Sequence, residues 1–241
     1  MNINDLDNLI REKEGVALSA AFPALMRKVY VWMTMALAIS GVMAYAVAAS
    51  PGLLQLIYGS RLSIWVLIIA ELVLVWKISG SVYKENRSLT ATTLMFIIFA
   101  ALNGVTLSSI FVLFAPAAII KTFAITAGTF GLTALYGYTT RRDLTRMGGL
   151  LFMALLGLIL AGVVNIFLHS SMLDTAVSII GVLVFVGLTA WDSQQIKMML
   201  TQAPDGGEAS QKMAVTGALS LYLDFINLFL YLLRFFGNSR D

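Results

Sequence analysis

Three carboxylates stand inside stretches of this 241-residue sequence that are otherwise almost entirely apolar: Glu71, Asp192 and Asp224. A charged side chain in hydrocarbon costs about 3 kcal/mol on insertion scales, so such residues usually serve proton transfer, ion passage or hydrogen bonding between helices. A carboxyl group can bind and release a proton, and its oxygens suit hard cations such as Ca²⁺. These three residues are therefore the candidates for the chemistry of the chain.

Polar residues recur at helical spacing around two of these carboxylates. Around Asp224 they form one stripe with a glycine at its start: Gly217, Ser220, Asp224, Asn227, Tyr231 and Arg234. A shorter stripe joins Thr189, Asp192 and Gln195. Two stripes that face each other bring Asp192 and Asp224 together, and two close carboxyl groups cannot both ionise cheaply in a low dielectric. They would share a proton and titrate as a pair, which predicts a proton-sensitive switch.

Each carboxylate also has a purely structural interpretation. Glu71 suits an ion pathway and a hydrogen bond between helices equally well. Asp192 lies near the end of its run and can reach toward water, whereas Asp224 is too central for that and would be a buried hydrogen bonder. The only histidine, His169, is interpreted as a residue of an interfacial loop, and Asn103 and Asn165 as hydrogen bonders between helices.

The elements that must position these residues are membrane helices. The chain is 59% hydrophobic and 12% charged, about half the charged fraction of soluble domains. Its apolar residues fall in seven runs of about 20 residues, the length that crosses a bilayer. The runs are Val29 to Ala49, Leu62 to Ile78, Ala91 to Phe114, Ala117 to Tyr138, Leu150 to Leu168, Thr175 to Met199 and Ala214 to Phe236. They are too continuous for barrel strands, so we predict an all-α integral membrane protein with seven transmembrane helices.

Charge and composition set the organisation around these helices. We predict an N-terminal segment over 1–28, a single membrane domain over 29–237 and a tail over 238–241. Assigning the loops to alternate sides of the membrane puts twelve of the 16 Lys and Arg on the side of the N-terminus, which predicts that this end lies in the cytoplasm and the C-terminus outside.

A net charge of +3 suggests no nucleic-acid partner, and the absence of cysteine excludes thiolate metal sites. No nucleotide motif occurs, so we expect no cofactor and only passive transport.

Several motifs match one membrane family. The segment Ala218–Phe229, followed by Leu232–Gly237, closely resembles the last-helix signature of the Bax inhibitor-1, or transmembrane Bax-inhibitor-motif, family. Trp191–Lys197 looks like the sixth-helix aspartate motif of that family, and the agreement continues in Glu71, Asn165–Phe167 and Val29–Met33. The resemblance implies a central last helix surrounded by the other six. For bacterial members it also implies a pH-sensitive calcium leak governed by a di-aspartyl pair.

Carried over by motif, that pair is Asp192 and Asp224, the same two residues that burial and spacing indicate. The resemblance further implies that a basic residue at the inner end of the second helix latches onto the pair in a closed state, and the candidates are Lys77, Lys84 and Arg87. Ca²⁺ would be held transiently by the two aspartates with backbone carbonyls, water and nearby side chains. The supporting residues are Glu71, Gln195, Ser220, Asn227 and Tyr231.

Two other function classes stay open. Two aspartates on consecutive membrane helices also mark intramembrane aspartyl proteases, but Leu221–Leu223 stand where those enzymes carry a Gly-x-Gly element, so we predict no enzyme. The family is also linked to restraining cell death in eukaryotes and to modulating a membrane protease in bacteria. The alternative is therefore a regulator that binds a membrane protease or another membrane protein through the N-terminal segment.

Overall fold

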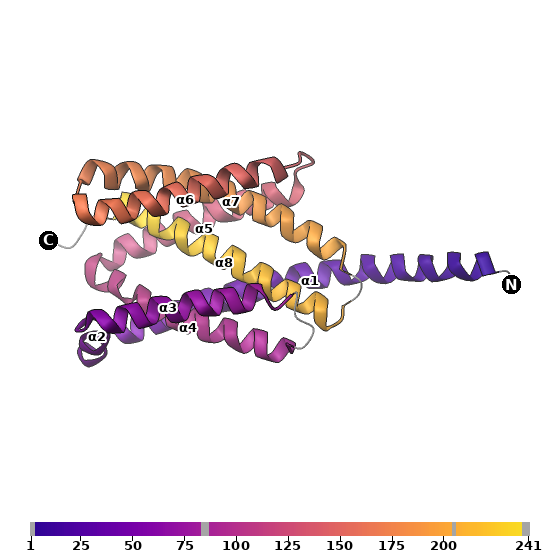
Figure 1. Cartoon of the computed structure of the whole chain (residues 1–241), viewed down its shortest axis with the longest axis horizontal. Helices are drawn as coiled ribbons and strands as arrows, with labels where there is room; N and C mark the ends of the chain where they lie inside the picture. Colours follow the sequence, from indigo (N-terminus) through magenta and orange to yellow (C-terminus); the bar gives the residue numbers. More distant parts are fainter. Residues whose placement is uncertain (1–2, 83–86, 204–205, 238–241) are drawn as a thin grey trace. The chain divides into compact units, whose positions relative to one another are not determined.

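The computed structural model describes the backbone of residues 3–82, 87–203 and 206–237, and side chains from residue 21 onward within those ranges. These residues form eight helices and no strand (Figure 1). Seven of the helices are long and apolar enough to cross a membrane, and α2 is not. The prediction of an all-helical protein with seven spans is confirmed. The helices are α1 (Ile3–Ala48), α2 (Pro51–Tyr58), α3 (Arg61–Ser79), α4 (Leu89–Leu113), α5 (Pro116–Thr139), α6 (Thr145–Leu168), α7 (Ser171–Thr201) and α8 (Glu208–Phe236).

Helix boundaries differ from the apolar runs where polar residues begin a helix. α7 and α8 start at Ser171 and Glu208, ahead of the runs predicted from Thr175 and Ala214, and each has an acidic residue in its first turn. Acidic side chains stabilise helix N-termini, which hydropathy alone does not detect. α2 was not predicted, because a helix of eight residues is far shorter than a membrane span.

The helices group into two compact units, and each is described by itself. Unit 1 comprises 1–43, 52–106 and 196–219. Within it, small residues allow α1 and α4 to pack closely: a Cβ on Gly104 would lie 2.5 Å from the Ser40 carbonyl oxygen. The Ser40 hydroxyl donates to the Ala100 carbonyl at 2.7 Å. This is the small-residue packing typical of membrane helices.

Unit 2 comprises 44–51, 107–195 and 220–241, and it contains α5, α6, most of α7 and the second half of α8. Glycines again mark the helix contacts, because a Cβ on Gly181 would lie 2.5 Å from the Tyr231 ring. The ring of Phe225 packs edge-on against Phe123 and Phe130, each with centroids 5.4 Å apart. These contacts fix α8 against α5 and α7 within this unit.

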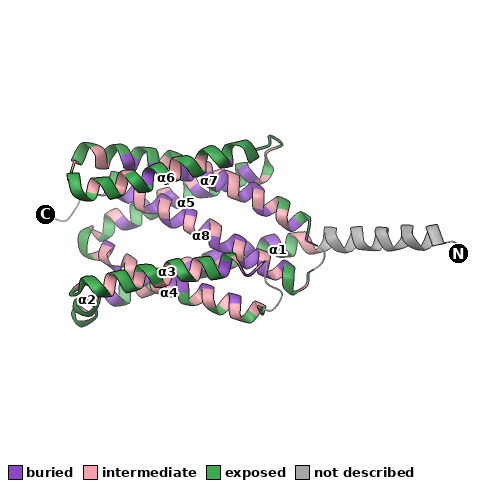
Figure 2. Cartoon of the chain, in the orientation of Figure 1, coloured by how far each residue is buried: buried purple, intermediate pink, exposed green. Residues whose placement is uncertain are grey.

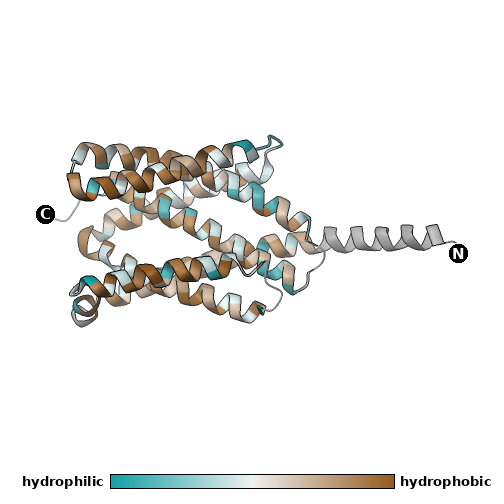
Figure 3. Ribbon diagram, viewed as in Figure 1, coloured by the Kyte–Doolittle hydropathy of each residue, from teal (hydrophilic) through white to brown (hydrophobic). Residues whose placement is uncertain are grey.

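The exposed faces of the helices are apolar. Trp65 and Trp76 on α3 are 62% and 73% exposed, and long exposed stretches of α6 are coloured hydrophobic (Figures 2 and 3). Water would not tolerate so much exposed apolar surface, whereas lipid solvates it. The chain is therefore a multi-pass integral membrane protein. In the most apolar 18 residues of α8, 67% of the residues are buried, the largest share among the seven spans. The position of α8 at the centre of the bundle stays a prediction.

Candidate functional site

Asp192 on α7 and Asp224 on α8 lie against each other within unit 2. Asp224 is 4% exposed and Asp192 is partly buried. Their carboxyl groups are within hydrogen-bonding reach of each other. The structure therefore places side by side the two residues that the polar stripes and the family motifs single out.

The hydrogen-bond inventory of this pair suits one shared proton. Oδ2 of Asp224 is buried, and no N–H or O–H group of the described residues reaches it. Ionised carboxylates only accept hydrogen bonds, so two ionised groups would face each other without a donor. A proton on either aspartate supplies that donor and turns a repulsive contact into a hydrogen bond.

Apolar packing holds Asp224 in place. Its neighbours Leu221, Tyr222 and Leu228 are fully buried. Asn227, one turn further along, donates to the Leu223 carbonyl of its own helix at 2.8 Å. The carboxyl group of Asp224 therefore lies on a helix segment whose other side chains are packed among apolar residues.

Three further residues of the predicted stripes, Tyr231, Ser220 and Gln195, lie on the same two helices as the pair. Tyr231 stacks on Phe185 of α7, with ring centroids 5.7 Å apart. Ser220 and Gln195 are partly buried, and each lies three or four residues from an aspartate and so on the same helix face. Their supporting roles stay predictions.

A clamp of side chains next to Asp192 ties α7 to α5 and to the loop before α6. The Ser193 hydroxyl donates to the Ala134 carbonyl at 2.8 Å. The Gln194 amide donates to the Arg142 carbonyl and accepts from the Leu144 N–H, both at 2.8 Å. Because these residues directly follow Asp192, the clamp fixes the height and rotation of that carboxyl group. Neither Ser193 nor Gln194 was predicted as a site residue, although the Trp191–Lys197 motif contains them.

Replacing Gln194 with Leu should destabilise the protein by about 2 kcal/mol, because the substitution leaves two backbone groups without partners. Thermal unfolding in detergent measures this effect. The matched control is Gln195→Leu, which removes an adjacent glutamine for which no such backbone contacts are seen. Equal unfolding temperatures for the two variants would contradict the assigned clamp.

Glu71 lies in unit 1, where it meets two donors from α4. The Asn103 amide donates to Glu71 at 3.2 Å and the Thr106 hydroxyl at 2.6 Å. These contacts agree with the interpretation of Glu71 and Asn103 as hydrogen bonders between helices. A role of Glu71 in an ion pathway stays a prediction.

Two of the candidate latch residues, Lys77 and Arg87, also lie in unit 1. The Arg87 guanidinium donates to the carbonyl of Lys77, whose own side chain is exposed. Lys84 lies outside the described residues. Lys212, near the start of α8, is only 5% exposed and donates to the Arg87 carbonyl at 3.1 Å. This buried cation was not predicted as a site residue, since it lies on the polar end of its helix, and the latch stays a prediction.

Comparison with known protein families assigns nearly the whole chain to one family. A family model described as inhibitor of apoptosis-promoting Bax1 matches residues 23–241. The chain belongs to the Bax inhibitor-1 family. The resemblance predicted from the motifs is thereby confirmed.

Relatives within this family cover nearly the full length of the chain. It is 46% identical to Inner membrane protein YbhL of Escherichia coli over 236 residues, which is 98% of this chain and 100% of the relative. A protein of Borreliella burgdorferi is 46% identical over 97% of this chain and 99% of its own length. A membrane protein of Streptococcus pyogenes is 35% identical over 97% of this chain and 99% of its own length.

A second polar cluster of this Bax inhibitor-1 family chain lies at the other end of unit 2. Arg234 pairs with Asp174 at 3.3 Å, and the Asn165 amide donates to the same carboxylate at 3.5 Å. Asn165 also accepts from the Ser170 N–H at 3.0 Å, as its predicted hydrogen-bonding role requires. His169 ends α6 in the left-handed conformation, with φ 49°, as expected for a loop residue.

No group of three or more histidine or acidic side chains in the described part of the chain is placed to hold a metal ion. The Asp192/Asp224 pair supplies two carboxylates, whereas Ca²⁺ takes about six to eight oxygen ligands. Most ligands of a Ca²⁺ ion at the pair would therefore be amide oxygens, carbonyls or water.

Proposed function

We propose that this chain is a pH-sensitive membrane calcium-leak protein whose flux depends on protonation of the Asp192/Asp224 pair. The observation that carries the proposal is the contact between two carboxyl groups on different helices, one of them buried without a donor among the described residues. Such a contact changes from attractive to repulsive when the shared proton leaves. It therefore couples the proton concentration to the packing of α7 against α8.

In the proposed cycle, loss of the proton strains the α7 and α8 contact and favours opening or ion entry. Binding of the proton seals the helices through the shared hydrogen bond. Ca²⁺ is the permeant ion, and the two carboxylates hold it weakly with oxygens of Gln195, Asn227, the backbone and water. Weak binding is needed because an ion that binds tightly does not leave. The protein needs no cofactor and acts as no enzyme in this proposal.

We place the protein in the bacterial cytoplasmic membrane, since the Escherichia coli relative is an inner membrane protein by name. The distribution of Lys and Arg supports an N-terminus in the cytoplasm and a C-terminus outside. The end of α7 nearer Asp192 then lies on the cytoplasmic side, together with the start of α8. Cytoplasmic pH would be the signal that the pair senses.

A regulator that binds a membrane protease or another membrane protein is the second candidate function. It is favoured by α1, which begins at Ile3 and continues without interruption into the span that starts at Ala21. The family match begins only at residue 23. A helix that precedes both the span and the family region could bind a partner protein outside the membrane.

Calcium flux into liposomes separates the two candidates. The full chain and a variant without residues 1–24 are reconstituted, and Ca²⁺ entry is followed while the pH is stepped from about 8 to about 5. The leak proposal predicts flux above that of empty liposomes in both proteins, falling as the pH falls. No flux at any pH would overturn the leak and favour the regulator.

A further inference from the structure

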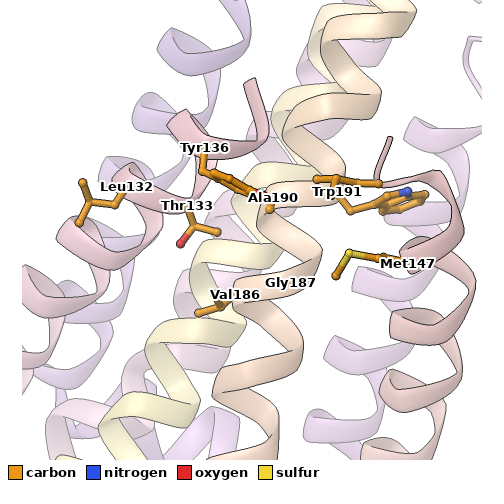
Figure 4. Close-up of a pocket in the computed structure, with 9 residues that line it drawn as sticks. Leu132, Thr133, Tyr136, Met147, Val186, Gly187, Ala190 and Trp191 are labelled. Atoms are coloured by element: carbon orange, nitrogen blue, oxygen red, sulfur yellow. The ribbon is translucent and has the colours of Figure 1, made fainter. Parts of the chain in front are cut away.

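An apolar groove lies between α5, α6 and α7 within unit 2 (Figure 4). Its volume is about 370 Å³, within the range of small-molecule sites of about 300–1,000 Å³. The side chains around it include Leu132, Tyr136, Met147, Val186, Ala190 and Trp191. They carry few polar atoms, so the groove suits a hydrocarbon chain better than a polar solute.

Small residues of α7 line the groove, and large exposed residues form its rim. Gly187 and Ala190 of α7 line the groove, whereas Leu132 and Tyr136 of α5 are exposed at its edge. In Figure 4 the rings of Tyr136 and Trp191 lie near one end of the groove, with Val186 further along α7. An exposed tyrosine such as Tyr136 is typical of the headgroup level of a bilayer, whereas the indole nitrogen of Trp191 is buried.

Positive charge gathers at this same end of the groove. Leu144 and Met147 line the groove. Three exposed arginines lie close to them in the sequence: Arg141, Arg142 and Arg146. The segment joins the ends of two candidate membrane spans, Pro116–Thr139 and Thr145–Leu168, so it lies at the level of lipid headgroups. Basic residues at this level attract anionic lipids.

One opposing charge lies within this arginine cluster. Hydrogen bonds from Thr145 lower the pKa of Asp143, so this carboxylate stays ionised and engaged with the start of α6. Three arginines against one aspartate leave a net charge of two positive. The Gln194 clamp holds the backbone of this loop at Arg142 and Leu144, which keeps the cluster at the end of the groove.

We propose that the groove is a binding site for one anionic phospholipid. An acyl chain lies along Tyr136, Val186 and Trp191, and the phosphate lies among Arg141, Arg142 and Arg146. The apolar lining and the net positive charge at one end match the two parts of such a lipid. A zwitterionic lipid fits the groove but lacks the net negative charge that the cluster favours.

Quenching of Trp191 fluorescence by brominated lipids tests this assignment. The full-length protein with Trp32, Trp65 and Trp76 replaced by Phe retains Trp191 as its only tryptophan. It is reconstituted in mixtures in which either phosphatidylglycerol or phosphatidylcholine carries bromine near the carboxyl end of the acyl chain. We expect phosphatidylglycerol to bind at least about fivefold more tightly than phosphatidylcholine, and the preference to fall with added salt.

Two sets of variants make the result specific. Combined Arg141→Gln, Arg142→Gln and Arg146→Gln substitutions should bring the preference close to one. Lys121→Gln, which removes a cation about 22 Å from Tyr136 along α5, should leave it unchanged. Val186→Phe should lower the maximal quenching by phosphatidylglycerol, because the larger ring fills the groove. Equal binding of the two lipids in the parent protein, or a preference that survives the triple substitution, would overturn the proposal.

Discussion

Substitution of Asp224 with Asn is expected to remove most of the pH dependence of calcium flux and to lower the flux at about pH 8 by about tenfold. The new side chain carries an amide that cannot ionise and that can donate a hydrogen bond to Asp192. The variant therefore resembles the protonated pair at every pH, and the helices stay sealed. The measurement is Ca²⁺ entry into liposomes of the purified variant, stepped from about pH 8 to about pH 5.

The companion variants give this prediction its specificity. Asp192→Asn should act in the same direction, since either carboxyl group can supply the shared proton. Asp174→Asn, which removes a half-exposed carboxylate paired with Arg234 from the same helix α7, should leave the pH profile in place. A pH dependence of calcium flux in Asp224→Asn equal to that of the wild type would contradict the gating mechanism but not the fold.

Substitution of Gly137 with Ala is expected to destabilise the protein by about 3 kcal/mol or more. A Cβ at this position would overlap the carbonyl oxygen and the Cα of Ala190 on α7. Both obstacles are backbone atoms, so no side-chain rotation relieves the overlap and α5 must move away from α7. The unfolding temperature in detergent and the yield of folded protein report the loss.

Gly131 provides the matched control on the same helix. A Cβ there meets no other atom within 4 Å, so Gly131→Ala should be neutral or slightly stabilising. Similar unfolding temperatures for the two alanine variants would show that α5 and α7 are not in backbone contact. Because Ala190 lies two residues before Asp192, a folded fraction of Gly137→Ala should also show altered flux.

The spans of this protein are predictable because a single physical length governs them. A run of about 20 apolar residues has few other uses, so seven spans follow from hydropathy. The start of α8 at Glu208 does not follow, because a polar first turn is stabilised by charge and not by lipid. Nor does α2, which is too short to be marked by its apolar content.

The site could be predicted only as far as helix faces allow. Spacing along α7 and α8 put Asp192 and Asp224 on polar helix faces, because residues three or four apart share a face, and the family motifs pointed to the same two residues. The partners of Gln194 could not be found this way, since its amide reaches backbone atoms of a loop about fifty residues earlier. The buried Lys212 also gave no signal, because lysine at a helix end is ordinarily exposed.

Infrared difference spectroscopy tests the central claim most directly, because the C=O stretch of a protonated carboxyl group reports the shared proton itself. The band is followed against pH in the reconstituted wild type and identified by its loss in Asp224→Asn. If the shared proton controls the leak, this band disappears over the same pH range in which Ca²⁺ flux rises. A band that titrates outside the range of the flux change, or no band that depends on Asp224, would contradict gating by the pair.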